Sequence, residues 1–169
     1  GWRPVRSADD EPRALGGSRD WVRSVGTALR LNAFGYAILL DGHTGSPRRM
    51  KDHEVIIGTR QDATCAPELA ACIAAVFRGH GFAVHKDVSG YTGGNIVATY
   101  GRPERCVHAV QVEVNAALLM TTGREEFIAL VTRGGIPAKA EANIARIRRC
   151  LREVVAALPS VLATVHARG

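Results

Sequence analysis

The sequence lacks any long apolar run, and it has few aromatic residues. No apolar stretch approaches the ~18 residues that a membrane-spanning helix needs, and no basic segment followed by an apolar one marks a secretory leader. Aromatic residues make up only 5% of the chain, too few to suggest a surface on which nucleic-acid bases stack. We therefore expect no membrane span and disfavour nucleic acid as a partner.

The chain also lacks any Cys-x-x-Cys pair among its four cysteines. Cys72 and Cys150 stand among Ala, Ile and Leu at helical positions, where a free thiol behaves as a small apolar residue. The other two are Cys65 and Cys106. This usage predicts reduced structural thiols in a cytoplasmic protein.

What is present indicates one globular α/β domain over residues 1–169. The chain is 46% hydrophobic and 22% charged, with a formal net charge of +6, and its length suits a single domain. The positive charge permits an anionic ligand, but the arginines are scattered along the chain, so a basic nucleic-acid binder is the weaker hypothesis. The sequence carries no signal for an oligomeric state.

Short apolar runs alternate with amphipathic stretches. Polar residues 1–20 predict a loop or loose end. The predicted strands are residues 36–41, 53–59, 82–87 and 107–115. The predicted helices are residues 21–33, a segment from Pro67 to Gly79 or Gly81, and one or two helices within 137–167. This alternation predicts an α/β fold with a mostly parallel or mixed sheet flanked by helices.

Two of these segments carry more specific predictions. The run 107–115 alternates apolar and polar residues and predicts a strand with one polar side, made of His108, Gln111, Glu113 and Asn115. Within 137–167, Pro159 is expected to break the helix. The inward face of that stretch is expected to hold Ile144, Ile147, Leu151, Val154 and Val155.

Chemistry-bearing side chains gather where predicted strands end, which is where open α/β sheets bind ligands. Asp41 and His43 follow the first strand, and Asp87, Glu113 and Asn115 lie at or near later strand ends. A histidine there suits metal binding or proton transfer, and a neighbouring carboxylate can orient its ring. The alternative is a polar turn in which the backbone satisfies His43.

Glu113 lies in the middle or late part of an apolar strand. A carboxylate there is paired, solvated or functional. A glutamate beside a metal-bound water is a common general base. An edge strand with one wet face is the equally weighted alternative.

A glycine-rich loop and two arginines complete the candidates. The loop 89–95, which contains Gly93, Gly94 and Asn95, can present backbone N–H groups to an anion, although it matches no nucleotide-binding pattern. Arg60 and Arg102 are expected to flank the site and to bind a substrate carboxylate in a bidentate manner. A lone arginine is also common on a solvated surface.

Taken in order, these segments resemble the N-formylglutamate amidohydrolase family. The family shows Asp-x-His-Ser after a strand, then Gly-(Asp/Thr)-Arg, Gly-Gly-x-Ile, Tyr-Gly-Arg-Pro and His-Ala-Leu-Gln-x-Glu-x-Asn. The matching segments run from about Tyr36 to Met120 and read "AILLDGHTGSP", "VIIGTRQDATCAPELAACIAAVFRGHGFAV" and "YTGGNIVATYGRPERCVHAVQVEVNAALLM". The resemblance implies a three-layer hydrolase architecture similar to that of the zinc carboxypeptidases and aspartoacylases.

The resemblance also implies roles for individual residues. His43 would be a ligand of Zn²⁺, with Asp41 behind it, and Glu113 would activate the metal-bound water that cleaves the amide of an N-formyl or N-acyl amino acid. The residues implied to hold the substrate are Arg60, Arg102, Gly93, Gly94, Asn95 and Asn115.

The chain departs from the family in ways that keep a second hypothesis open. The family takes two further zinc ligands from upstream of Asp-x-His, yet residues 1–35 contain no histidine and the chain begins with Gly1. We therefore expect a piece that lacks its N-terminal part. Ala116 and Leu119 replace an Arg and a Tyr of the family pattern, which leaves the substrate open. The alternative is a catalytically inactive or truncated relative that acts as a binding or interaction domain.

Overall fold

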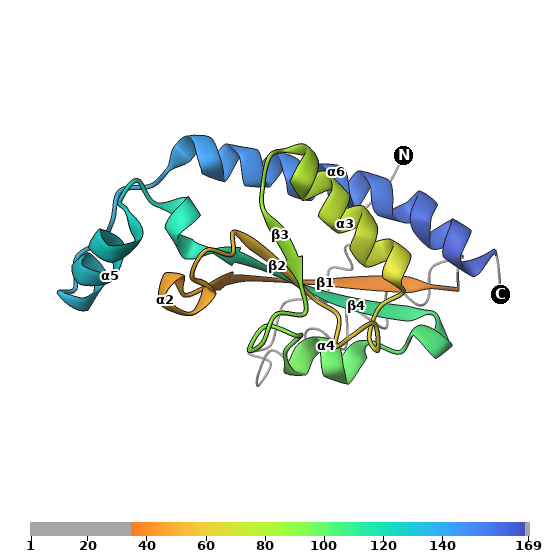
Figure 1. The fold of residues 1–169 in the computed structure, drawn as a ribbon. Helices are drawn as coiled ribbons and strands as arrows, with labels where there is room; N and C mark the ends of the chain where they lie inside the picture. The colour runs from red at the N-terminus through yellow and green to blue at the C-terminus, as the bar shows by residue number, and fades with distance from the viewer. Residues whose placement is uncertain (1–34, 168–169) are drawn as a thin grey trace, which may run out of the picture.

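A computed structural model describes residues 35–167, where a four-stranded sheet lies between helices (Figure 1). In chain order the elements are β1 (Ala37–Gly45), α2 (Pro47–Met50), β2 (Val55–Gly58), α3 (Pro67–Gly79), β3 (Val84–Lys86), α4 (Asn95–Tyr100), the 3-10 turn η1 (Pro103–Arg105), β4 (Val107–Asn115), the 3-10 turn η2 (Ala116–Leu119), α5 (Arg124–Thr132) and α6 (Glu141–His166).

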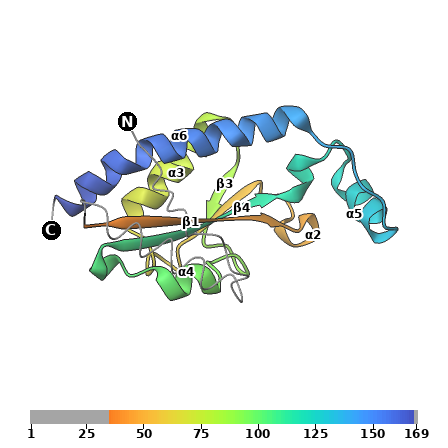
Figure 2. The ribbon, with the colours of Figure 1, turned by 180° about the vertical axis from the view of Figure 1, so that it is seen from behind.

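The sheet is mixed and has helices on both faces. Its strand order is β1-β4-β2-β3; β4 runs parallel to β1 and antiparallel to β2, and β2 runs parallel to β3. Figures 1 and 2 show α3 and α6 along one face and α4 on the other. The predicted α/β class with a mixed, helix-flanked sheet in three layers is confirmed.

Strand β4 lies inside the sheet, and the prediction of a single polar side was wrong. Residues 108–115 are all buried, because β1 and β2 cover both edges and helices cover both faces. Strand alternation separates His108 from Gln111 and Glu113. The His108 ring instead points to the α3/α6 face, where Nδ1 accepts a hydrogen bond from the Ala66 N–H and Nε2 lies 3.0 Å from Nε2 of His166.

Strand β1 is longer than predicted. Its nine residues pair in continuous register with β4, from Ala37 opposite Val107 to Gly45 opposite Asn115. The backbone pairing therefore carries the strand through a polar, glycine-containing segment that the sequence indicates as a turn. As a result Asp41 and His43 lie within the strand, two residues apart on the same face.

The apolar layer lies between the sheet and helices α3 and α6. Phe77 is fully buried and meets Phe82 edge to face, with ring centroids 5.9 Å apart. The buried residues of α6 are Ile147, Cys150, Val154, Leu158 and Leu162. The prediction that Leu151 and Val155 face inward was wrong, since they are 40% and 61% exposed. Each follows a buried residue directly, and one residue turns a helix by about 100°.

Helix α6 continues through Pro159, so the predicted break does not occur. The proline removes one backbone hydrogen bond, to the carbonyl of Val155. Buried Leu158 and Leu162 anchor the chain on either side of it. Tertiary packing therefore outweighs the lost bond.

The observed ends of α3 agree with the prediction, whereas the start of α4 differs from it. Helix α3 begins at Pro67 and ends at Gly79, as its sequence indicates. Asn95 begins α4 rather than ending a loop. The predictions for residues 1–20 and 21–33 lie outside the described residues. Within 35–167, no helix has both the length and the apolar character required to cross a membrane.

Candidate functional site

The α4 face of the sheet carries four polar side chains from two adjacent parallel strands. β1 contributes Asp41 and His43, and β4 contributes Gln111 and Glu113. Asp41 pairs in register with Gln111, and His43 pairs with Glu113. Side chains at paired positions of neighbouring strands point to the same face, so the register alone brings these four together.

Asp41 fixes the ring of His43. Nε2 of His43 lies 2.9 Å from Oδ1 of Asp41, whose side chain is only 9% exposed, whereas that of His43 is 45% exposed. The second carboxylate oxygen of Asp41 is buried and has no hydrogen-bond partner among the described residues. When Nε2–H donates to Asp41, the lone pair of Nδ1 is left for a ligand.

Gln111 links the glycine loop to Glu113. Its Oε1 accepts the backbone N–H of Gly94 at 3.0 Å, and its Nε2 donates to Oε1 of Glu113 at 3.0 Å. Both groups of the amide are thereby used, which fixes their orientation. Sequence reasoning placed Gln111 on the correct face but gave it no role, because the signal depends on a contact with a distant loop.

Burial raises the pKa of Glu113 above its ordinary value. Neighbouring His43 opposes this shift by favouring the charged carboxylate, and the negative charge of Asp41 adds to it. A carboxyl group whose pKa moves towards neutrality is better suited to accept and return a proton at neutral pH. Desolvation is the largest of these effects, because burial disfavours the charged form of a carboxyl group.

Tyr91 belongs to the same neighbourhood and was not predicted. Burial raises the pKa of Tyr91, and the charge of Glu113 raises it further, while Arg49 opposes the shift. A Cβ atom on Gly45 would lie 3.3 Å from the Tyr91 ring, which places this ring against the end of β1. In the sequence, Tyr91 is marked only by its place in the glycine-containing loop 89–95.

The glycine loop lies directly against the turn after β2. A Cβ atom on Gly58 would lie 2.6 Å from the backbone nitrogen of Gly93, so the two backbones need a glycine there. The N–H of Arg60 donates to the carbonyl of Thr92 at 2.6 Å, and its exposed guanidinium reaches the carbonyl of Gly93 at 3.5 Å. The predicted residues Arg60, Gly93 and Gly94 are therefore neighbours, and Gly94 connects them to Gln111.

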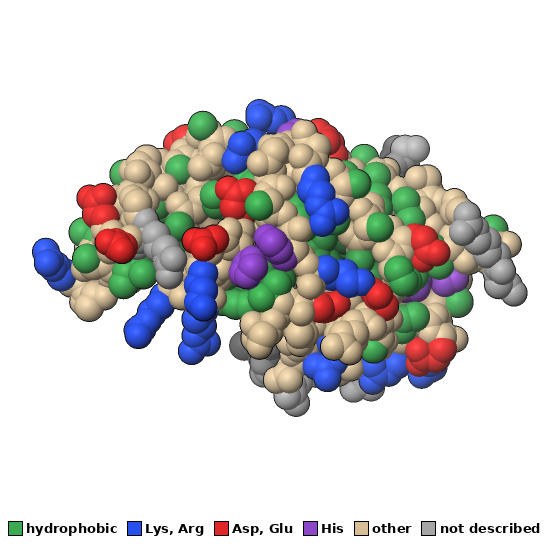
Figure 3. Space-filling model, in the orientation of Figure 1, with side chains coloured by type: hydrophobic (Ala, Val, Ile, Leu, Met, Phe, Trp, Pro, Cys, Tyr) green, Lys and Arg blue, Asp and Glu red, His purple; other side chains and the backbone are tan. Residues whose placement is uncertain are grey.

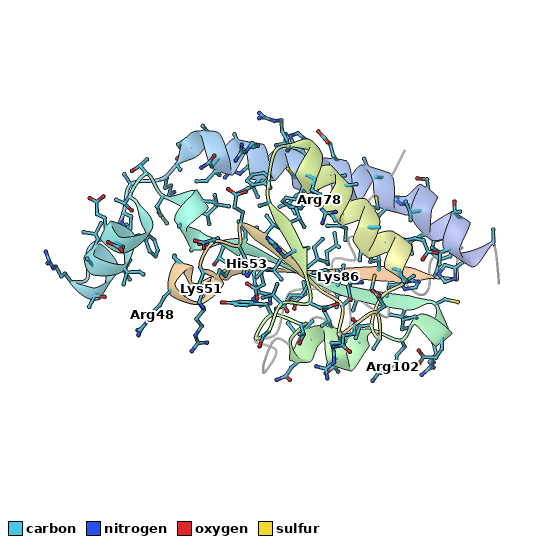
Figure 4. The ribbon with its side chains drawn as sticks, viewed as in Figure 1. Arg48, Lys51, His53, Arg78, Lys86 and Arg102 are labelled. Atoms are coloured by element: carbon cyan, nitrogen blue, oxygen red, sulfur yellow. The ribbon has the colours of Figure 1, made fainter. Side chains whose placement is uncertain are left out.

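The structure does not bring Arg102 to this cluster. Arg102 forms a bridge with Val107, the first residue of β4, and Glu113 lies six residues further along that strand, roughly 20 Å at 3.3 Å per residue. Figure 4 shows Arg102 beyond the end of α4, and its Nη1 donates to the carbonyl of Ala98. The prediction that it flanks the same site as Arg60 was wrong, because helix α4 leads the chain away from the glycine loop.

Asn115 has a structural role. Its Nδ2 donates to the carbonyls of Lys51 and His53, and its Oδ1 accepts the N–H of Ala117. These bonds hold the segment before β2 and begin the turn η2. Since the amide is committed to backbone groups, the structure gives no support to its predicted contact with substrate. Asn95, in contrast, is exposed at the start of α4.

The donor set of the described residues fits only part of a zinc site. Among residues 35–167, no partner is recorded for Nδ1 of His43 when its Nε2 bonds to Asp41, and the buried Oδ2 of Asp41 has no hydrogen-bond partner. A catalytic zinc takes three protein ligands and keeps an open position. Within residues 35–167, no group of three or more His, Cys, Asp or Glu side chains is placed to hold a metal ion.

The face of the molecule drawn in Figure 3 shows no concentration of one charge. In Figure 3, lysines and arginines are interspersed with acidic side chains over this face. The two imidazoles of His53 and His85 meet there, with ring centroids 4.3 Å apart. A backbone-tracking nucleic-acid site would need a continuous basic surface, and this face does not offer one.

Comparison with known proteins gives consistent matches. Residues 19–120 match the family model described as N-formylglutamate amidohydrolase. The chain is 36% identical over 135 residues to an N-formylglutamate deformylase of Pseudomonas aeruginosa, covering 75% of this chain and 47% of that protein. It also resembles the crystal structure of an N-formylglutamate amidohydrolase from Ralstonia eutropha JMP134 in fold. There the TM-score is 0.63 and the identity 20%, over 85% of this chain and 49% of that one. The chain thus spans about half the length of these relatives.

Proposed function

Because this chain belongs to the N-formylglutamate amidohydrolase family, we propose that it forms part of the active site of a hydrolase. The substrate is N-formylglutamate or a related N-acyl amino acid, and the bond cleaved is the linear amide. The observation that carries the proposal is Glu113, a buried carboxyl with a raised pKa, held by Gln111 beside His43.

Glu113 moves the proton in this proposal. It accepts a proton from the attacking water as the water oxygen bonds to the acyl carbon. It then returns that proton to the amide nitrogen as the C–N bond breaks, which releases formate and the free amino acid. Gln111 occupies Oε1 of Glu113, and this leaves Oε2 for the water.

His43 is the proposed zinc ligand, with Asp41 holding its ring. Zinc would supply polarisation of the acyl carbonyl and acidification of water. The remaining ligands have to come from outside residues 35–167, and therefore no step is assigned to the metal. The four cysteines are free thiols, which supports the cytoplasm as the proposed location.

The substrate carboxylates are assigned to Arg60 and the glycine loop. The guanidinium of Arg60 is exposed beside Gly93, and an arginine matches a carboxylate through two parallel hydrogen bonds. Asn95 directly follows Gly94 and is exposed at the start of α4, where it is a further candidate contact for a substrate carboxylate. The polar groups at this end of the sheet therefore divide into a proton-transfer part and a binding part.

The test is formate release from N-formyl-L-glutamate by the purified protein. Glu113→Gln should lower kcat by at least about 10²-fold, in the range expected for loss of a general base, while Glu104→Gln, a matched change at an exposed position of η1, should not. Equal activity of the Glu113→Gln and Glu104→Gln variants would show that Glu113 is not the base. Zinc content is measured in parallel for wild type, His43→Ala and the control His53→Ala.

The second candidate is an inactive relative that serves as a binding domain. The incomplete ligand set within residues 35–167 favours it. If this candidate is correct, neither wild type nor His43→Ala should release formate or contain zinc. Near-stoichiometric zinc in wild type and in His53→Ala, lost only in His43→Ala, would exclude it.

A further inference from the structure

Three consecutive residues after β2 adopt a left-handed backbone. The φ angles of Arg60, Gln61 and Asp62 are 52°, 58° and 65°. Residues other than glycine visit this region as single residues rather than in runs, and they persist there only where surrounding contacts over-determine the conformation. Something outside the turn therefore has to hold it.

Asp87 holds this turn from the neighbouring strand. Its Oδ1 accepts the N–H of Thr59 at 2.8 Å, and its Oδ2 accepts the hydroxyl of Thr59 at 2.8 Å and the N–H of Gln61 at 3.2 Å. Asp87 follows β3 directly, and its own N–H donates to the carbonyl of Ile57 at 2.8 Å. One carboxylate thus fixes the start and the middle of the turn.

Lys86, the preceding residue, makes a different contact. Its Nζ reaches both carboxylate oxygens of Asp62, at 2.6 and 2.8 Å. Lys86 ends edge strand β3, and Figure 4 shows it between α3 on one side of the sheet and α4 on the other. This ion pair is partly exposed and touches only the last residue of the turn. Removing Lys86 therefore serves as a matched control for removing the hydrogen bonds of Asp87.

The clamped turn sets the position of Arg60. The Arg60 N–H bonds to Thr92, and the Gly58 backbone lies against Gly93, so a change in the turn displaces Arg60 relative to the glycine loop. That loop is in turn bonded to Gln111. The separation between Arg60 and Glu113 therefore depends on the conformation that Asp87 selects.

We propose that Asp87 is the positioning residue for the carboxylate-binding arginine, Arg60. It does not touch the substrate; it fixes the left-handed turn that holds the Arg60 guanidinium beside Gly93. This inference rests on the proposed function only in that Arg60 is taken to bind a substrate carboxylate.

The experiment measures the binding of glutarate, a dicarboxylate with no bond to cleave, by calorimetry on the purified protein. Asp87→Ala should weaken binding at least about tenfold, the order expected when a charge-assisted hydrogen bond is lost. Asp87→Asn, which keeps one acceptor oxygen, should be intermediate. Lys86→Met should bind as wild type does, and Arg60→Ala combined with Asp87→Ala should be no weaker than Arg60→Ala alone.

Catalysis provides the second measurement. With N-formyl-L-glutamate, the Asp87 variants should raise KM and leave kcat within about twofold, since uniform binding is lost rather than transition-state stabilisation. A fall in kcat at constant KM, or glutarate affinity unchanged by Asp87→Ala, overturns the inference. So does a wild-type protein that fails to bind glutarate. A wild type that binds glutarate through Arg60 but releases no formate overturns the proposed function and leaves the positioning role supported.

Discussion

The two faces of the sheet share the same strands but present opposite chemistry. β4 turns Val110, Val112 and Val114 towards the core formed with α3 and α6, and it turns Gln111 and Glu113 towards the α4 face. The first set is buried against apolar side chains, which stabilises the fold. The second set is buried beside polar side chains, and the loss of hydration on burial raises the pKa of Glu113.

The difference shows that burial has two uses in this chain. On the α3/α6 face it lowers the free energy of the folded state. On the α4 face it keeps a carboxyl group, a carboxylate and an imidazole close together at some expense in stability. Changes on the first face should therefore affect stability, and changes on the second should affect activity.

The largest effect is expected for Phe77→Ala on the apolar face. Phe77 is 0% exposed, and truncating a buried phenylalanine costs about 3–5 kcal/mol of unfolding free energy. Urea denaturation measures the loss, with Leu151→Ala, at an exposed position of the same layer, as the control. A loss for Phe77→Ala no greater than that for Leu151→Ala would contradict the assignment of the core to this face.

The next largest effect is a loss of folding stability in acid, which originates at His108 on the α3/α6 face. Burial lowers the pKa of His108 to about 4 from its ordinary 6.5, the positive charge on His166 adds to the shift, and Glu68 opposes it. Above pH 6.5 both folded and unfolded forms are neutral, so nothing is lost. Between pH 6.5 and about 4 the unfolded chain gains the proton first, and stability falls by about 3 kcal/mol, at ~1.4 kcal/mol per pH unit.

Urea midpoints between pH 7.5 and 4.5 measure this loss. His108→Gln removes the titrating group and should flatten the pH dependence over that window, although other groups still titrate. If the variant keeps the wild-type slope, His108 is not the source of the stability loss in acid.

Glu113→Gln on the polar face should have a smaller effect on stability and the opposite sign. The folded state raises the pKa of Glu113, so its ionisation above that pKa weakens the fold. A neutral amide of similar shape removes this penalty, and the variant should melt at a higher temperature than wild type at neutral pH. The gain should disappear as the pH falls below the ordinary carboxyl range; a lower melting temperature at pH 7.5 would refute the account.

The smallest effect is expected at the sheet edge, for Lys86→Met. The Lys86–Asp62 pair is partly exposed, and such pairs contribute about 0.2–1 kcal/mol. Thermal melts in low and high salt should bring wild type and variant together as the pair is screened. A difference that persists in high salt would indicate a packing role for the Lys86 side chain.

Local signals in the sequence were sufficient for much of the fold. Pro67 and Gly79 bound α3, and the apolar runs located all four strands of the described sheet. Non-local effects were missed. The extension of β1 depends on pairing with β4, and the continuity of α6 through Pro159 depends on packing of Leu158 and Leu162.

The candidate site divides in the same way. In the sequence, Asp41 and His43 stand out as polar groups where an apolar strand is predicted to end, and Glu113 as one within an apolar strand. The parallel register places them on one face. Their catalytic roles stay predictions. Tyr91 enters through a loop from a distant part of the chain, and no local pattern marks such an approach.

Pro159 has a consequence for how the helix opens in solution. The carbonyl of Val155 lacks its helical donor, so the hydrogen-bond ladder of α6 is interrupted at one point although the helix is continuous. Amide protons before and after this point should therefore exchange with solvent as two separate groups. The later group, which ends at His166, is tied to the sheet by the His108–His166 contact. Mild acid should speed its exchange before it affects the rest of the helix.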